Sequence, residues 1–279
     1  MTFPLVFVRG GGDLGSGVAH RLRVSGFRVV ILDVAAPTLV RHTVSFATAI
    51  FTGSHEVEGL IARRVDPADD DAAIARTLAA GEIPVLVDPD ALAMRRLRPA
   101  VVVDAILAKR PGSSRIADAP LVIALGPGHV AGRDAHAVIE THRGHRLGRV
   151  ITSGAAAENT GTPGEIGGAA EERVLRAPAS GVFRGAVRVG ERVLCGAVVG
   201  RIDGHDVAAR TDGILRGLLW DGVAVRAGMK LGDVDPRADA HAIREISDKS
   251  RAVAGGVLEA IFRFRENWMA DFHSEEGES

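Results

Sequence analysis

The residues of this chain that could carry out chemistry begin in a glycine-rich loop near its start. Gly10, Gly12 and Gly15 follow the G-x-G-x-x-G order, with Gly11 and Asp13 in the same loop. Backbone N–H groups of such a loop, placed at the positive end of a helix dipole, favour an anionic group such as a phosphate. The loop therefore predicts binding of a nucleotide or a similar ligand. The alternative reading is a tight turn in an ordinary α/β sheet.

The elements around the loop supply the context that this fingerprint requires. An apolar run over residues 4–8 predicts a strand before it, and residues 18–24 predict an amphipathic helix behind it. A second predicted strand, residues 28–32, ends at Asp33. A carboxylate about 20 residues after the loop can accept hydrogen bonds from a ribose hydroxyl, and it would favour NAD over NADP by repelling a 2′-phosphate.

Two further groups follow predicted strands of the same sheet. Asp104, Lys109 and Arg110 come after a strand over residues 101–103, and Gly126 and Gly128 come after one over residues 121–125. Because ligands of open α/β sheets bind at the carboxyl ends of the strands, Lys109 and Arg110 are expected to close on the anion held by the glycine loop. The predicted cofactor-binding residues are Gly10, Gly11, Gly12, Asp13, Gly15, Asp33, Asp104, Lys109, Arg110, Gly126 and Gly128.

Other reactive side chains of the sequence predict neither a metal site nor a catalytic site. His129, His136, His142 and His145, with Glu140, are the densest group of metal-ligand types, but their spacing matches no known metal motif, so no metal site is predicted. The turn that contains Arg143 and His145 is either a basic surface turn or an alternative anion site. No nucleophile–base pair is evident, so the catalytic residues stay unknown. Cys195 could carry a persulfide, although a small buried filler is favoured.

The order of apolar runs predicts a two-domain α/β protein. Up to about residue 154, predicted strands such as residues 84–87 alternate with helical patterns such as residues 69–80. This alternation is typical of a parallel sheet covered by helices. We therefore expect a Rossmann-like, mostly parallel sheet over residues 1–158, where the cofactor would bind, followed by a linker over residues 159–175.

The second part of the chain contains an internal repeat. Residues 177–185 align without gaps with residues 209–217, at an offset of 32 residues, and the match continues onward. Two small β units of this kind would stabilise each other by interlocking. They resemble the barrel-sandwich hybrid of biotinyl and lipoyl domains, here two 27-residue repeats over residues 176–237. A helical segment over residues 238–270 would follow, and residues 246–249 offer a helix cap within it. Residues 271–279 would be a disordered tail.

A biotinyl or lipoyl carrier function is disfavoured, because carriers attach their group to a lysine in the hairpin between the two halves. Residues 202–207 join the halves here and contain no lysine. Lys230 lies inside the second half, where its counterpart in the first half is Val198. Lys230 therefore reads as a surface residue.

Composition restricts the location and the partners. The chain has 34 basic and 35 acidic residues among 279, so no global field attracts nucleic acid or a membrane surface. Its single cysteine fits a reducing compartment. No signal-peptide pattern and no apolar run near the length of a membrane span is evident. We expect a cytoplasmic protein with small-molecule or protein partners, and homo-oligomerisation stays open.

Several motifs together resemble the YqeB family over nearly the whole chain. Among them are residues 9–14, 103–110, 126–128, 137–145, 164–168, 228–237 and 247–249. The resemblance implies a role in a selenium-dependent molybdenum hydroxylase system. His142 departs from the family pattern, in which asparagine is usual, so a metal role that depends on it would not transfer.

The resemblance and the glycine loop together suggest a function. The expected function is an accessory protein of molybdenum hydroxylase maturation that binds a nucleotide-containing cofactor, such as molybdopterin dinucleotide. A molybdenum hydroxylase or its cofactor-assembly proteins would then be its partners. The alternative is an NAD(P)-dependent oxidoreductase. The suspected cofactors are accordingly a molybdopterin-type cofactor or NAD(P).

Overall fold

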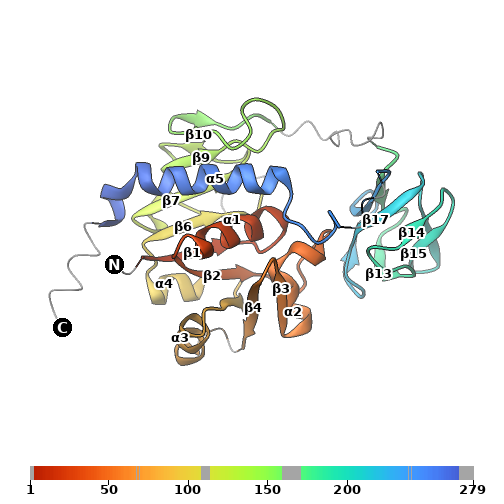
Figure 1. Ribbon diagram of the computed structural model, residues 1–279, viewed down its shortest axis with the longest axis horizontal. Coiled ribbons are helices and arrows are strands. Elements are labelled where there is room, and N and C mark those ends of the chain that lie inside the picture. The colour runs from red at the N-terminus through yellow and green to blue at the C-terminus, as the bar shows by residue number, and fades with distance from the viewer. Residues whose placement is uncertain are drawn as a thin grey trace.

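A large sheet forms the centre of the N-terminal part of the chain (Figure 1). The computed structural model describes residues 3–66, 68, 70–107, 114–158, 171–237, 239 and 241–269. Within these residues, nine strands pair in the order β10-β9-β7-β6-β1-β2-β5-β4-β3. Their bounds are β1 (Leu5–Arg9), β2 (Arg28–Asp33), β3 (Ser54–Val57), β4 (Leu60–Val65), β5 (Ile83–Val87), β6 (Val101–Asp104), β7 (Leu121–Leu125), β9 (Ala137–Ile139) and β10 (Val150–Ile151).

The central strands are buried on both faces, which explains their continuous apolar sequence. In β1, Val6 and Val8 point to one core and Phe7 points to the other, and all three are fully buried. The first core lies under α1 (Asp13–Val24) and α5 (Asp248–Arg263). The second core lies under α3 (Asp71–Ala79) and α4 (Leu92–Leu97). The sheet is therefore the middle layer of three.

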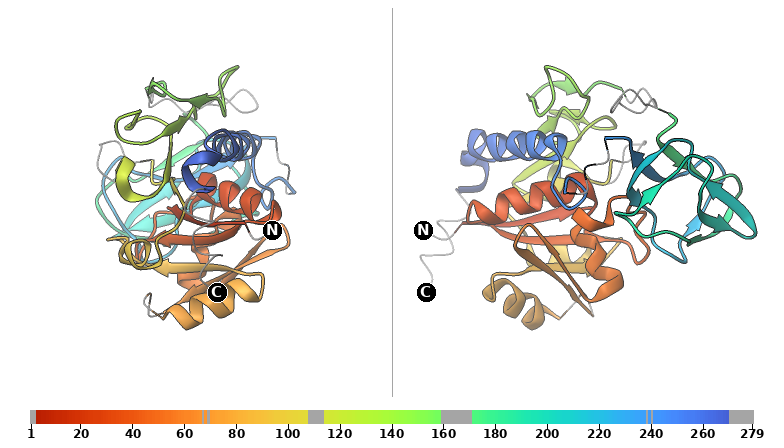
Figure 2. Two further views of the ribbon diagram at one scale, coloured as in Figure 1. Left: turned by 90° about the vertical axis from the view of Figure 1, so that its left-hand side faces the viewer. Right: turned by 45° about the vertical axis from the view of Figure 1, so that its right-hand side comes forward.

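Helix α5 returns from the end of the chain to pack beside α1, and Figures 1 and 2 show the two helices side by side. Gly256 of α5 packs closely against the loop between β9 and β10 rather than against α1. A Cβ on Gly256 would lie 2.1 Å from the carbonyl oxygen of Gly148, whereas a Cβ on Gly255 would meet nothing within 4 Å. As the sequence predicts, Ser247 caps α5 by accepting a hydrogen bond from the Ser250 N–H at 3.1 Å.

The C-terminal strands form a separate lobe beside the large sheet (Figure 2). Within the described residues they pair as two antiparallel sheets, β12-β19-β17-β14 and β16-β15-β13-β18. The bounds are β12 (Val174–Arg176), β13 (Gly181–Gly185), β14 (Arg192–Val193), β15 (Val198–Ile202), β16 (His205–Ala208), β17 (Gly213–Leu218), β18 (Ala224–Val225) and β19 (Lys230–Asp235).

The internal repeat explains these two sheets. The first copy contains β13, β14 and β15, and the second contains β17, β18 and β19. Strand β14 of the first copy pairs with β17 of the second, and β18 of the second pairs with β13 of the first. The copies thus exchange strands, so that neither buries its apolar residues alone.

Several short elements lie between the longer helices and strands. They are η1 (His42–Val44), η2 (Phe46–Thr48), α2 (Ala49–Thr52), η3 (Ile116–Asp118), and the paired strands β8 (Val130–Ala131) and β11 (Gly154–Ala155).

Phe51 of α2 stacks on Trp220 of the C-terminal lobe, with ring centroids 4.9 Å apart. A Cβ on Gly217 would lie 2.7 Å from the Val40 carbonyl oxygen. The two parts of the chain therefore pack closely at this contact.

The fold class predicted from the sequence is wrong. Most strand pairs of the large sheet are parallel, as predicted, but the sheet is mixed, because β3 and β10 join its edges antiparallel. The connections from β6 to β7 and from β7 to β9 contain η3 and β8, where a Rossmann-like fold would place helices. The C-terminal part forms two small antiparallel sheets, where the prediction had a biotinyl/lipoyl-like barrel-sandwich hybrid. Periodicity could not predict this outcome, because edge pairing and crossovers depend on tertiary contacts.

Candidate functional site

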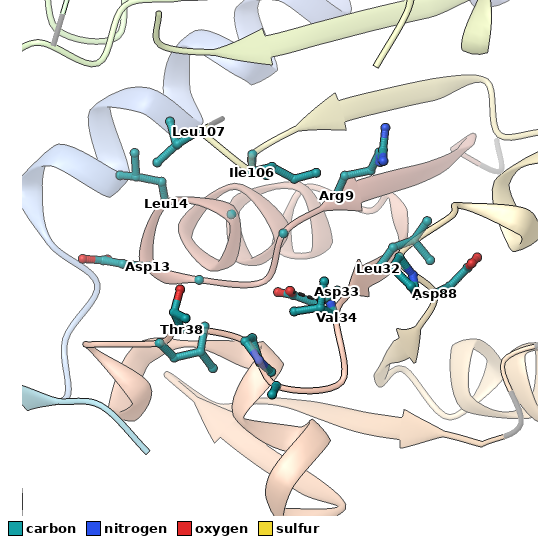
Figure 3. Close-up of a pocket in the computed structure, with 18 residues that line it drawn as sticks. Arg9, Asp13, Leu14, Leu32, Asp33, Val34, Thr38, Asp88, Ile106 and Leu107 are labelled. Carbon is teal, nitrogen blue, oxygen red and sulfur yellow. Dashed lines mark hydrogen bonds between the residues drawn. The ribbon is translucent and has the colours of Figure 1, made fainter. Parts of the chain in front are cut away.

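The glycine loop lines a cavity of about 400 Å³, the glycine-loop cavity, at the carboxyl ends of β1, β2, β5 and β6 (Figure 3). Gly10 adopts a φ of +94° and lies against the residue that follows β6, since a Cβ there would lie 3.0 Å from the Ala105 carbonyl oxygen. Gly15 is equally confined, because a Cβ would lie 1.9 Å from the Gly10 carbonyl oxygen. These two positions require glycine, and the tight turn follows from them.

Asp33 holds the loop in place from the neighbouring strand. Its Oδ2 accepts a hydrogen bond from the Gly11 N–H and its Oδ1 accepts one from the Val34 N–H, both at 2.8 Å. Burial raises the pKa of the Asp33 carboxyl, and the two N–H donors oppose that rise. The carboxylate also lines the glycine-loop cavity, so it supports the loop and faces the cavity at once.

The structure separates the other predicted residues. Gly10, Gly12, Asp13, Gly15 and Asp33 line the glycine-loop cavity, and Gly11 supports it through Asp33. Asp104, Gly126 and Gly128 are not among its lining residues. Lys109 and Arg110 lie outside the described residues, as do residues 159–170 of the predicted linker and the predicted tail.

Asp104 is buried on β6 and points to a histidine instead. Its Oδ1 accepts a hydrogen bond from the Ile106 N–H at 3.1 Å, and its Oδ2 lies 3.7 Å from Nε2 of His129. Gly126 follows β7 with a φ of +70°, and a Cβ there would lie 2.6 Å from Oγ1 of Thr141. Both residues shape the loops at this edge of the sheet.

A second cavity of about 370 Å³ lies where the C-terminal lobe meets the start of α1. Among the described residues, six basic side chains line it: Arg41, Arg143, Arg173, Arg216, Lys230 and Lys249. The acidic side chains that line it are Asp13 and Asp233. We call it the cationic cavity.

The cations of this cavity come from distant segments, and several are buried. Arg173 donates a hydrogen bond to Oδ2 of Asp233 at 3.0 Å, and both side chains are less than one-tenth exposed. Arg216 and Lys230 approach the same oxygen at 3.7 and 3.4 Å. One carboxylate is thus shared by three cations, which leaves a net positive charge around it.

Lys249 faces the cationic cavity without a direct partner. Within the described residues, neither a hydrogen bond nor an ion pair involves its ammonium group, which is half-buried at the start of α5. Burial, reinforced by the nearby positive charge of Arg143, lowers the pKa of Lys249. Burial and Arg41 likewise lower the pKa of Arg216. The cavity therefore concentrates positive charge that its own carboxylates do not neutralise.

Sequence reasoning missed this cavity, because its residues share no local pattern. The sequence places Arg143 in an alternative anion site, Lys230 on the surface and Lys249 in a helix cap. The structure brings all three to one cavity. The cysteine prediction is also wrong, because Cys195 is exposed rather than buried.

The histidine group does not converge. Nδ1 of His136 accepts a hydrogen bond from the Val122 N–H at 3.0 Å. Glu140 accepts from the His142 and Ala157 N–H groups at 2.7 and 2.8 Å. Across the described parts of the chain, no three His, Cys, Asp or Glu side chains are placed to hold a metal ion. Helices there are also too short or too polar to cross a membrane.

Comparison with known proteins gives one strong sequence match. The chain is 51% identical over 257 residues, 92% of its length, to the uncharacterized protein YqeB of Escherichia coli (strain K12). The chain is a homologue of YqeB. It covers 47% of that protein, so it spans about half the length of the curated relative that it matches. The match supports the resemblance to the YqeB family, while no protein-family model matches the chain.

Matches to solved structures are weak. An aspartoacylase family protein from Mesorhizobium loti has 10% identity and a TM-score of 0.26, covering 83% of this chain and 85% of that one. A succinylglutamate desuccinylase/aspartoacylase from Rhodobacter sphaeroides has 14% identity and a TM-score of 0.25, covering 84% and 86%. At these scores, the names of the neighbours assign no activity to this chain.

The function predicted from the sequence is contradicted. Four of these neighbours are named as an aspartoacylase family protein, two succinylglutamate desuccinylases and an ectoine utilization protein, and none of the four is named as a maturation factor or as an NAD(P)-dependent oxidoreductase. The YqeB match adds no support, since that protein is itself described as uncharacterized. A glycine loop after a strand recurs in many α/β proteins, and it was too general a signal for that prediction.

Proposed function

We propose that this protein binds a small organic anion in the cationic cavity. The observation that carries the proposal is the lining itself, with six basic side chains against two carboxylates. One of the six, Arg143, also pairs at 2.9 Å with Asp248, which does not line the cavity, so the cations still outnumber the carboxylates. Such an excess of like charge in a partly buried site is costly unless an anion neutralises it. Arginine and lysine also provide the charge-assisted hydrogen bonds that recognise carboxylate and phosphate groups.

The start of α1 supports the same proposal. Gly12 is the N-cap residue of α1 and has no side chain, and both Gly12 and Asp13 line the cationic cavity. The first turn of a helix leaves backbone N–H groups without intrahelical partners, and the helix dipole is positive there. The six cations and the helix terminus therefore favour negative charge at one place.

The test is calorimetric titration of the full chain with inorganic phosphate and with citrate. We expect both anions to bind, and Lys249→Gln to weaken each at least fivefold, because no group of the described residues pairs with the Lys249 ammonium. Arg133→Gln is the matched control. Arg133 is exposed and bonds the adjacent Asp134, so that variant should bind like the wild type. Binding unaffected by Lys249→Gln would contradict the proposal.

The cofactor and partner predictions are separate from this proposal and stay predictions. A molybdopterin-type cofactor, NAD(P), a molybdenum hydroxylase or its cofactor-assembly proteins can each be added to the same titration. The eleven site residues predicted from the sequence likewise await a binding measurement.

A further inference from the structure

The glycine-loop cavity and the cationic cavity share part of their walls. Gly12, Asp13, Thr38 and Leu39 line both. Figure 3 shows Asp13 and Thr38 at one end of the glycine-loop cavity and Asp88 at the other, with Asp33 between them. The two cavities are therefore adjacent at Gly12.

The two cavities differ in chemistry. The glycine-loop cavity has apolar walls formed by Leu14, Leu32, Val34, Leu39, Ile106 and Leu107, among others. At its rim, Val34 and Ile106 are each 45% exposed and Leu107 is 42% exposed. Large apolar side chains gathered at the mouth of a cavity are typical of a ligand-binding surface.

The charged groups of the glycine-loop cavity oppose an anion there. Asp33 and Asp88 both line it, and Asp88 accepts hydrogen bonds from the Leu92 and Ala93 N–H groups at 3.0 and 2.7 Å. Arg9 also lines it and donates to Ser114 at 3.0 Å. Each oxygen of Asp33 accepts one backbone N–H, and a carboxylate oxygen can accept a second donor. This cavity thus suits an uncharged group that donates a hydrogen bond.

We infer that the ligand is an amphipathic organic anion that spans both cavities. Its charged group lies in the cationic cavity, and its largely apolar body lies in the glycine-loop cavity with a hydroxyl or amine donor at Asp33. This inference rests on the proposed function and adds the class of the ligand.

Gly12 gives a way to separate the two cavities. Its φ of −74° and ψ of −170° are accessible to any residue. The atom nearest to a Cβ built on Gly12 is Cδ2 of Leu39, at 3.7 Å, which is ordinary contact. A valine is therefore compatible with the backbone, and its branched side chain would narrow the passage between the cavities.

The experiment compares inorganic phosphate, phenyl phosphate and 4-hydroxyphenyl phosphate by calorimetry on the full chain. For the wild type we expect phenyl phosphate to bind at least tenfold more tightly than phosphate, and the hydroxyl to add a further threefold. In Gly12→Val the advantage of phenyl phosphate over phosphate should fall below twofold. Because Gly12 also lines the cationic cavity, the readout is the ratio of the two affinities measured on the same variant.

The outcomes separate this inference from the proposed function. If none of the three probes binds, the proposed function fails and this inference fails with it. If phosphate binds and phenyl phosphate binds no better, the anion site stands and the spanning ligand is wrong. An aromatic advantage that persists in Gly12→Val also overturns the inference, because the body would then lie elsewhere.

A second variant covers the case in which Gly12→Val does not fold. Ile106→Asn changes an exposed residue at the apolar rim, and it should reduce the aromatic advantage at least threefold without changing phosphate binding. Ile61→Asn is its control, because Ile61 is 37% exposed on β4 and lines neither cavity. Equal effects of the two variants would contradict the inference.

Discussion

The Asp13 carboxylate, on the first residue of α1, lies 3.2 Å from the guanidinium group of Arg41, which is 6% exposed. The same guanidinium donates to the carbonyl oxygens of Ala242 and Glu245 at 3.3 and 3.0 Å. Asp13 also accepts a hydrogen bond from the Ser250 hydroxyl at 2.7 Å. This ion pair thus joins the glycine loop to the segment that leads into α5.

Replacing Arg41 should destabilise the fold. In Arg41→Met, Asp13 loses its cation and two carbonyl groups lose their donor, so we expect the free energy of unfolding to fall by about 3 kcal/mol. Urea denaturation measures it. Arg201→Met is the control, since that exposed pair with Asp206 should contribute less than about 1 kcal/mol. Equal losses in the two variants would show that the pair between Arg41 and Asp13 stabilises the fold no more than an exposed ion pair does.

The adjacent glycines of α5 should respond in opposite directions to alanine. Gly256→Ala forces a Cβ against the Gly148 carbonyl oxygen, so we expect a loss of about 1–3 kcal/mol of stability. Gly255→Ala meets open space and should gain about 0.5–1 kcal/mol through helix propensity. Urea midpoints of the two variants test this directly, and a loss in both would indicate that α5 tolerates no side chain on this turn.

Acid should weaken the contact between the two parts of the chain. Burial, followed by the charge of His55, lowers the pKa of His42, whose ring meets Trp220 edge-on at 5.5 Å. An unfolded histidine titrates near a pH of about 6.5, so below that pH the unfolded state takes up the proton first. Stability contributed by neutral His42 is therefore present above this pH and is lost as the pH falls toward the lowered pKa.

The variant His42→Phe tests this pH dependence. It keeps an aromatic ring against Trp220 and removes the titrating group, so its unfolding free energy should fall less steeply than that of the wild type between about pH 6.5 and 5. Part of the slope should remain, because burial also lowers the pKa values of His55 and His136. Identical slopes would assign the acid sensitivity to other groups.

Anion binding should weaken at alkaline pH, because the lowered pKa of Lys249 removes its charge earlier than that of an ordinary lysine. Phosphate affinity is therefore expected to fall as the pH rises through that pKa. The variant Lys249→Arg keeps its charge throughout, since arginine stays protonated. Calorimetry at neutral pH and at an alkaline pH below the ordinary lysine pKa of about 10.4 should show a decline for the wild type that the arginine variant lacks. A parallel decline in both would exclude Lys249 as its source.

Local sequence determined the elements that depend on local rules. Continuous apolar runs predicted β1, β2, β5, β6 and β7, because strands buried on both faces need no polar alternation. The Ser247 cap was predicted for the same kind of reason, since its hydrogen bond spans three residues. The 32-residue repeat predicted two β units that interlock, and β14 and β18 do cross between the copies.

Tertiary structure alone decided the rest, because the deciding contacts join distant segments. The mixed character of the large sheet depends on how β3 and β10 pair at its edges, which apolar pattern does not encode. The internal repeat shows that the lining of the cationic cavity also depends on tertiary contacts. Arg184 and Arg216 occupy equivalent positions, yet Arg184 is exposed and Arg216 lines the cationic cavity. The repeat residues that line this cavity, Arg216, Lys230 and Asp233, all belong to the second copy. Position in the fold, rather than residue type, therefore gave Arg216 its place in the cationic cavity.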